Sequence, residues 1–169
     1  MKNRYEINCK DLYTMFYMAE AFYLSAEKSA PLGYNPEIFK SGDAICAHFI
    51  TVYFINTAFA IELYLKCLAC IEKNEYKSGH NLYELFCDLS EENQRILTVD
   101  FQKTGHMYSL PSLLKQSGNT FENFRYLFED IKNKLNPFSI QGAIPIIRKR
   151  ISELNEELIM EDVVPNLSK

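Results

Sequence analysis

The sequence lacks internal repeats, Gly/Ser-rich linkers and low-complexity tracts, so nothing in it marks a boundary between domains. Of its 169 residues, 47% are apolar. A chain of roughly this length buries about 70% of its unfolded surface, which is enough for a core without metal or disulfide staples. We therefore expect a single domain over residues 1–169, with a frayed tail from about residue 163.

The sequence also lacks a disulfide framework. Its five cysteines are odd in number and irregularly spaced, which is typical of reduced thiols in a cytosol. Cys67 and Cys70 form a C-x-x-C pair, but they lie inside a helical pattern with no preceding strand and no further metal ligands. We interpret them as small core residues and predict no metal site and no cofactor.

No apolar signal-peptide core is present in Met1–Lys10, which carries charges of both signs, so we predict a cytoplasmic protein. The uncharged run Ala44–Ile61 just reaches the length of a membrane span. Polar residues such as His48 and Asn56 interrupt it, and Glu62 and Lys66 follow it directly. This pattern favours a buried helix in a soluble bundle, with no membrane partner.

Helical spacing of apolar residues runs through most of the chain. It predicts a first helix over Asp11–Ala30, which is expected to end at the helix-breaking residues Pro31, Gly33 and Pro36. A second helix, capped by Ser41 or Asp43, should reach Lys73. Its apolar residues surround the whole circumference, which predicts a central helix or one shared with a partner subunit. Residues 74–79 are predicted to form a turn.

The second half of the sequence predicts shorter helices. Asn81 with Glu84 forms a capping box, Ser90 starts another helix that fades near Gly105, and residues 107–119 suggest a loop with at most one helical turn. Asn119 with Glu122 opens a further helix that Pro137 ends. A final helix is predicted over residues 139–160, with Pro145 either near its first turn or causing a kink, and its inner side is expected to hold Ile144, Ile147, Ile151, Leu154 and Leu158. No alternating strand pattern is seen. The expected fold is an all-α bundle of about five main helices.

Two charged pairs at helical i,i+4 spacing interrupt apolar surroundings. Glu62 precedes Lys66 on the second helix, and Arg125 precedes Glu129 on the later one, where Tyr126 lies between them. Such pairs can be solvated surface ion pairs worth a few tenths of a kcal/mol. They can also line a polar cleft if the two helices pack together, and the sequence leaves both interpretations open.

These pairs belong to three segments that together resemble the HEPN family of helical domains. The segments are Ala60-Ile61-Glu62-Leu63-Tyr64-Leu65-Lys66, Gly79-His80-Asn81-Leu82 with Leu85-Phe86 and Leu89, and Asn123-Phe124-Arg125-Tyr126-Leu127-Phe128-Glu129. The resemblance implies a helical bundle, commonly homodimeric, from prokaryotic toxin–antitoxin, phage-defence or nucleotidyltransferase-associated systems. Many members of this family are metal-independent ribonucleases.

Ribonuclease activity in that family is associated with an R-x(4–6)-H motif, in which Arg stabilises phosphate charge and His moves the 2′-hydroxyl proton. This sequence departs from the motif. The positions after Arg125 that should offer His hold Asp130, Ile131 and Lys132, and no other Arg does better. Ribonuclease activity therefore does not follow from the resemblance.

A different set of polar residues remains as a candidate site. His80 would act as acid and base, Arg125 and Lys66 would hold phosphate, and Glu62 or Glu129 would orient them. A single His beside a turn is also often a structural residue, and His48 and His106 offer still weaker candidates. The candidate cleft comprises Glu62, Lys66, His80, Arg125, Tyr126 and Glu129.

The charge pattern gives limited support to a nucleic-acid partner. The net charge is −4, so the chain as a whole lacks the basic surface that drives phosphate binding. One basic segment, followed at once by acidic residues, is more typical of a solvated dipolar helix than of an RNA-binding surface. Its members are Lys132, Lys134, Arg148, Lys149 and Arg150.

Three functions remain open at this point. The first is a nucleotide- or RNA-binding module that acts as a homodimer. The second is an atypical metal-independent ribonuclease that uses His80 and Arg125. The third is a structural or interaction domain whose charged pairs only hold helices in register. Motifs of P-loop nucleotide hydrolases, zinc peptidases and serine hydrolases are absent from the sequence.

Overall fold

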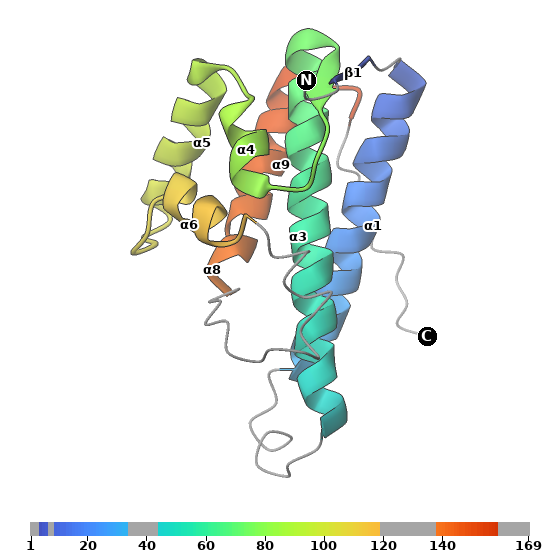
Figure 1. Ribbon diagram of the computed structural model, residues 1–169, viewed down its shortest axis with the longest axis vertical. Coiled ribbons are helices and arrows are strands. Elements are labelled where there is room, and N and C mark those ends of the chain that lie inside the picture. The colour runs from blue at the N-terminus through green and yellow to red at the C-terminus, as the bar shows by residue number, and fades with distance from the viewer. Residues whose placement is uncertain (1–3, 7–8, 34–43, 119–137, 159–169) are drawn as a thin grey trace.

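The computed structural model describes residues 4–6, 9–33, 44–118 and 138–158. These residues are mostly helical, which confirms the predicted all-α class (Figure 1). The predicted helix after Asn119 and the predicted frayed tail lie outside the described residues. In chain order, the elements are β1 (Arg4–Glu6), α1 (Cys9–Gly33), α3 (Ala44–Lys73), β2 (Glu75–Lys77), α4 (Leu82–Cys87), α5 (Glu91–Lys103), α6 (Leu110–Gln116), α8 (Phe138–Gln141) and α9 (Ala143–Leu154).

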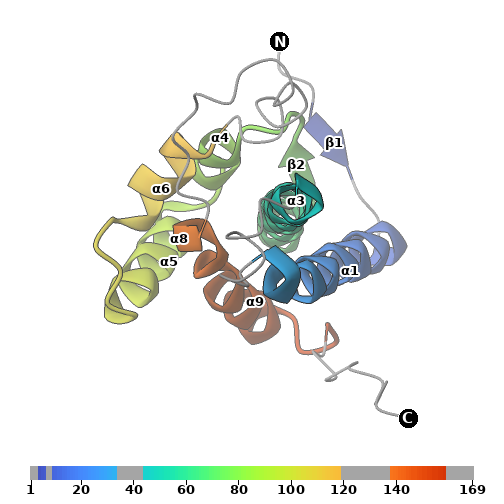
Figure 2. The same cartoon turned by 90° about the horizontal axis from the view of Figure 1, so that it is seen from below.

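Helix α3 is the central element of the bundle. Seen along its length, it lies between α1 on one side, α9 on another and α4 on a third (Figure 2). Ala60, Ile61, Leu65 and Leu68 are all 0% exposed, although they point in several directions around the helix. The apolar circumference predicted from the sequence is therefore covered by neighbouring helices.

Among the described residues, one helical segment is long and apolar enough to cross a membrane. It is Val52–Lys73 of α3, and 72% of its apolar window is buried inside the protein. Burial of this kind is found in the core helix of a soluble protein.

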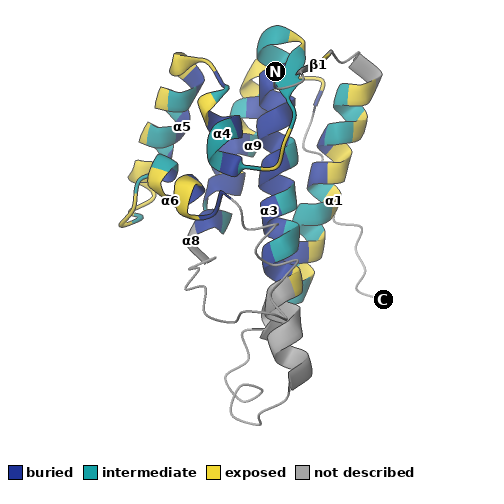
Figure 3. Cartoon of the chain, viewed as in Figure 1, coloured by how far each residue is buried: buried dark blue, intermediate teal, exposed yellow. Residues whose placement is uncertain are grey.

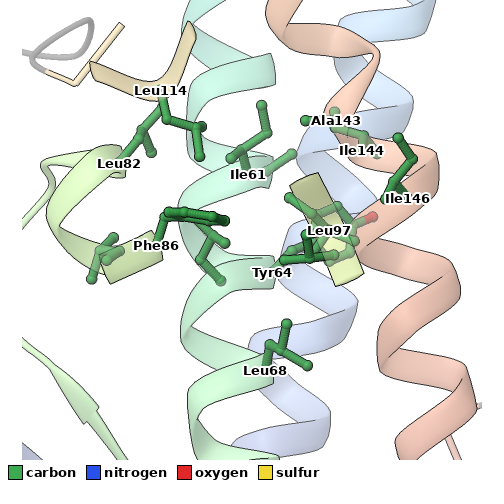
Figure 4. Close-up of a cluster of buried hydrophobic side chains, with 14 of the residues drawn as sticks. Ile61, Tyr64, Leu68, Leu82, Phe86, Leu97, Leu114, Ala143, Ile144 and Ile146 are labelled. Carbon is green, nitrogen blue, oxygen red and sulfur yellow. The ribbon is translucent and has the colours of Figure 1, made fainter. Parts of the chain in front are cut away.

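The hydrophobic core collects side chains from the helices packed around α3, and the buried surfaces face inward (Figure 3). Ile61, Tyr64 and Leu68 of α3 lie at its centre (Figure 4). The neighbours around them come from α4, α5, α6 and α9 and include Leu82, Phe86, Leu97, Leu114, Ala143, Ile144 and Ile146. Burying one such large aliphatic or aromatic side chain contributes about 1.5–3 kcal/mol.

Side-chain caps start the short helices where the sequence predicts them. Asn81 Oδ1 accepts a hydrogen bond from the Glu84 amide at 3.0 Å and starts α4, and Ser90 Oγ accepts one from the Asn93 amide at 3.2 Å and starts α5. Helix α6 is longer than the single turn expected. Ser109 caps it, and a proline in its first turn, where no amide donor is needed, is compatible with a second turn.

The last predicted helix is interrupted and shorter than expected. It divides into α8 and α9 at Gly142, and α9 ends at Leu154 with Asn155 as its C-cap. The residues expected on its inner side, Ile144, Ile147, Ile151 and Leu158, are 0–2% exposed, whereas Leu154, the last residue of α9, is 40% exposed. Pro145 lies in the first turn of α9, where a missing amide donor is tolerated. The first helix also differs from the prediction. Helix α1 continues through Pro31 to Gly33, beyond the expected end at Ala30.

The expectation of no strands is wrong for two short segments. Strand β1 pairs antiparallel with β2, with Tyr5 opposite Tyr76, and the pair lies beside the C-terminal end of α3 (Figure 2). Part of the predicted turn over residues 74–79 is therefore β2. Strands of three residues are too short for an alternating pattern to appear in a sequence.

The imidazole ring of His106 packs directly against Gly142, the residue between α8 and α9. A Cβ atom added there would overlap His106 Nε2, and the ring cannot easily move because it stacks on Phe101 with centroids 4.4 Å apart. We expect Gly142→Ala to lower the free energy of unfolding by about 1–3 kcal/mol through overpacking. Urea denaturation of Gly142→Ala, His106→Ala and the double variant checks this, since the double variant should recover most of the loss. If Gly142→Ala lowers stability equally in the wild-type and His106→Ala backgrounds, overpacking against the His106 ring is contradicted.

The C-x-x-C cysteines are core residues. Cys67 is 0% exposed and Cys70 is 3% exposed, and neither forms a disulfide, whereas Cys87 is exposed. Burial raises the pKa of the Cys67 thiol well above its usual value and raises the pKa of Cys70 to about 11. At pH 8 we expect a thiol reagent to modify Cys87 promptly and Cys67 and Cys70 only as the protein unfolds, as read by peptide mass spectrometry. Rapid native-state labelling of Cys67 would disagree with this packing.

Candidate functional site

Glu62 and Lys66 form an ion pair inside the protein. Lys66 Nζ donates a hydrogen bond to Glu62 Oε1 at 2.7 Å, and Lys66 is 8% exposed and Glu62 4%. The interpretation as a solvated surface pair is therefore wrong, because α3 is covered by its neighbours where these two side chains lie. Removing either charge from a buried pair leaves the other uncompensated in a medium of low dielectric constant.

His80 joins this pair from the turn that precedes α4. Its Nδ1 lies 3.0 Å from Glu62 Oε1 and 3.1 Å from Glu62 Oε2, while its side chain is 54% exposed. A carboxylate that accepts from Nδ1–H fixes the orientation of an imidazole ring, so Nε2 is the nitrogen that faces away from Glu62. The structure thus brings together three of the six candidate residues: a buried cation, a buried carboxylate and a half-exposed histidine.

The turn that carries His80 is fixed on both sides. Gly79 adopts φ +108°, a conformation that side chains rarely adopt, so a glycine is needed there. On the other side, Asn81 caps α4, and the Leu82 amide donates to the Gly118 carbonyl oxygen at 3.2 Å. His80 is therefore held by local backbone geometry as well as by Glu62.

Two tyrosines that were not predicted as site residues complete the surroundings of Lys66. Lys66 Nζ lies 5.5 Å from the centre of the Tyr76 ring, and Tyr76 stacks on Tyr5 with ring centroids also 5.5 Å apart. Burial raises the pKa of the Tyr76 hydroxyl. Both tyrosines lie on β1 and β2, and no signal in the sequence could identify them because these strands were not predicted.

Arg125, Tyr126 and Glu129 lie outside the described residues, so the predicted contact between the two charged pairs stays a prediction. The last described residue before them, Gly118, packs against the cap of α4. A Cβ atom at Gly118 would lie 3.0 Å from the amide group of Asn81, next to His80. The chain that leads to Arg125 thus leaves the described structure beside the turn that carries His80.

The described part of the basic segment holds helices together. Arg148 donates to both carboxylate oxygens of Glu20 at 2.7 Å, and Arg150 donates from Nε to Asn93 Oδ1 at 2.5 Å. Only Lys149 among these three residues is exposed, at 65% of its side chain. Two of the three cations are therefore engaged in contacts between helices, neither solvated as in the dipolar-helix interpretation nor presented as an RNA-binding surface.

The cluster has the donors and acceptors for proton transfer and anion binding. A histidine oriented by a carboxylate can accept or donate a proton at Nε2, and its protonated form can bind an anion. Within residues 4–6, 9–33, 44–118 and 138–158, no group of three or more His, Cys, Asp or Glu side chains is arranged to hold a metal ion.

Comparisons of the chain with protein-family models, with curated proteins and with solved structures found no match. The resemblance to HEPN domains therefore rests on the three segments of this sequence. The fold class rests on the arrangement of the helices, and the site on the geometry around Glu62.

Proposed function

We propose that this chain is a HEPN-like helical protein that binds RNA or a nucleotide at a surface site centred on His80. The observation that carries the proposal is the hydrogen bond from His80 Nδ1 to the buried carboxylate of Glu62, which orients a half-exposed imidazole. The protein would act in the cytoplasm of a prokaryote, in a defence or toxin–antitoxin system. Because the R-x(4–6)-H motif is absent, the primary role is binding without catalysis.

The charges of the cluster suit a phosphate group. Glu62 is compensated by Lys66 at 2.7 Å, so protonation of His80 leaves the cluster with net positive charge. A charge-assisted hydrogen bond from an imidazolium to a phosphate oxygen is about twice as strong as a neutral one. Arg125, which lies outside the described residues, would supply a second cation if the predicted helix that carries it packs parallel to α3.

A metal-independent ribonuclease is the second candidate, favoured by the same histidine–carboxylate contact. An imidazole oriented through Nδ1 can accept the 2′-hydroxyl proton at Nε2, after which O2′ attacks phosphorus and the P–O5′ bond breaks. The same proton can then pass to the departing O5′ atom. The products would be a 2′,3′-cyclic phosphate end and a 5′-hydroxyl end.

Incubation with total RNA in EDTA separates these candidates. Wild type, His80→Ala and Arg125→Ala are compared, with His106→Ala as a matched histidine control that lies in another loop. Intact RNA in every sample, together with binding of a labelled oligoribonucleotide, supports the binding module. Cleavage that both site variants lose, with cyclic phosphate ends, supports the ribonuclease.

Binding of the labelled oligoribonucleotide should weaken about tenfold or more in His80→Ala, because a hydrogen bond to a charged group contributes about 1.5–3 kcal/mol. Fluorescence anisotropy measures this, and the melting temperature of His80→Ala should stay close to that of wild type because the side chain is half-exposed. If the protein binds no oligoribonucleotide or nucleotide and is not stabilised by either, both candidates are contradicted. The third function, a structural or interaction domain, then remains.

The homodimer belongs to the same proposal. Its support is the resemblance to a family that is commonly homodimeric, together with exposed apolar side chains on α1 such as Tyr17, at 58%, and Met18, at 49%. Multi-angle light scattering of the purified protein checks it. A mass of one chain across the accessible concentration range would contradict the dimer.

A further inference from the structure

The ammonium group of Lys66 is enclosed although it lies next to a surface histidine. The Lys66 side chain is 9% exposed, and its Nζ lies 2.7 Å from Glu62 Oε1 and 5.5 Å from the centre of the Tyr76 ring. His80, which contacts the same carboxylate oxygen at 3.0 Å, is 54% exposed. One basic side chain of the cluster is therefore accessible and the other is covered.

The Tyr76 ring that lies over the Lys66 ammonium group is stacked against β1. Tyr76 stacks on Tyr5 at 5.5 Å with 26° between the ring planes, and Tyr5 is directly opposite Tyr76 in the two-stranded sheet. Each strand has three residues, and Tyr5 is 49% exposed. Because a three-residue strand forms few backbone hydrogen bonds and its Tyr5 side chain is half-exposed, β1 belongs to the elements that open most easily.

We propose that β1 is a displaceable cover that keeps the Lys66 ammonium group out of contact with ligands until the strand moves away. With β1 displaced, Tyr76 loses its stacking partner, and Lys66 and His80 become available together to one phosphate group. Both nitrogen atoms already contact Glu62 Oε1, which places them close enough for this. The part that concerns the phosphate rests on the proposed function, whereas the cover itself does not.

Amine acetylation of the full chain tests the cover without any ligand. Wild type, Tyr5→Ala and Tyr5→Phe are treated briefly with an acetylating ester at pH 8, and modification of each lysine is read by peptide mass spectrometry. Loss of an aromatic stacking contact shifts an opening equilibrium by about two- to tenfold, and labelling tracks the open population when opening is fast. We expect Lys66 labelling to rise by that factor in Tyr5→Ala and to stay at the wild-type level in Tyr5→Phe.

Lys149 is the internal control, because its side chain is 65% exposed and its labelling should be equal in all three proteins. Unchanged Lys66 labelling in Tyr5→Ala would overturn the proposal. A Tyr5→Ala protein that loses its cooperative thermal transition would also overturn it, since a displaceable strand must be dispensable for the fold.

Anisotropy with a labelled oligoribonucleotide then tests the role of the cover in binding. We expect Tyr5→Ala to bind about two- to tenfold more tightly than wild type, in step with the opening equilibrium. If Lys66 labelling increases in Tyr5→Ala but none of the proteins binds the oligoribonucleotide, the proposed function is contradicted and the proposal that β1 covers Lys66 is supported. Increased labelling with equal binding by wild type and Tyr5→Ala would overturn the role of the cover in ligand access.

Discussion

Glu62→Leu should lower the free energy of unfolding by about 3–5 kcal/mol, because the substitution leaves the Lys66 ammonium buried without its carboxylate. Lys66 is 8% exposed, and Glu62 Oε1 lies 2.7 Å from its Nζ. The loss should appear as a large shift of the urea midpoint. An exposed i,i+4 pair would lose less than about 1 kcal/mol.

Two variants control for effects other than the unpaired charge. Glu62→Leu combined with Lys66→Met replaces both ions by apolar side chains and should recover most of the stability. Glu153→Ala removes the carboxylate that faces Lys149 and Arg150 on the surface of α9, where its side chain is 41% exposed, and should have little effect. A Glu62→Leu variant no less stable than Glu153→Ala would contradict the buried pair.

Glu20→Ala should lower the free energy of unfolding by about 2–4 kcal/mol, the second largest loss predicted here after that of Glu62→Leu. Glu20 Oε1 accepts from the Tyr64 hydroxyl at 2.6 Å, and both oxygens accept from Arg148 at 2.7 Å. One carboxylate therefore joins α1, α3 and α9. Its removal leaves the buried Tyr64 hydroxyl and the largely buried Arg148 guanidinium without their hydrogen-bond acceptor. Urea denaturation measures the loss, and Tyr64→Phe, which removes one of these bonds, should lose only about 1 kcal/mol. Equal effects of the two variants would contradict the shared role of Glu20.

The same contact predicts how stability responds to alkaline pH. Burial, with the hydrogen bond to Glu20, raises the pKa of the Tyr64 hydroxyl above its usual value of 10.0. The folded chain then keeps a proton that the unfolded chain loses, so the stability present below pH 10 falls as the pH rises through that value. Melting temperatures from about pH 8 to about pH 11 should fall less steeply in Tyr64→Phe than in wild type. Equal slopes of melting temperature against pH in wild type and Tyr64→Phe would contradict the raised pKa of Tyr64.

Local patterns in the sequence predicted the elements that local interactions determine. The caps at Asn81 and Ser90 were predicted because a side chain and an amide three residues later form the bond within one turn. The central position of α3 was predicted because apolar residues on all sides need partners on all sides. These features depend on neighbours along the chain or on composition alone.

Features that depend on distant contacts were missed. The close contact of the His106 ring with Gly142 and the pairing of β1 with β2 join residues far apart in the sequence, and neither leaves a periodic signal. Glu62 and His80 were both placed in the candidate cleft, where Glu62 or Glu129 was to orient the other residues, and the structure brings Glu62 and His80 together. The burial of Glu62 was not anticipated, since exposure of a helix face depends on which elements cover it.

Contact between His80 and a phosphate-bearing ligand is the central claim, and NMR of the histidine ring protons tests it most directly. An oligoribonucleotide or nucleotide is added to the protein while the Hε1 signals of His80 and His106 are followed, each assigned by its alanine variant. We predict that the His80 signal shifts in a saturable manner and that the His106 signal, from a ring stacked on Phe101, does not. A His80 signal that stays in place at saturating concentrations of both probes would contradict the claim.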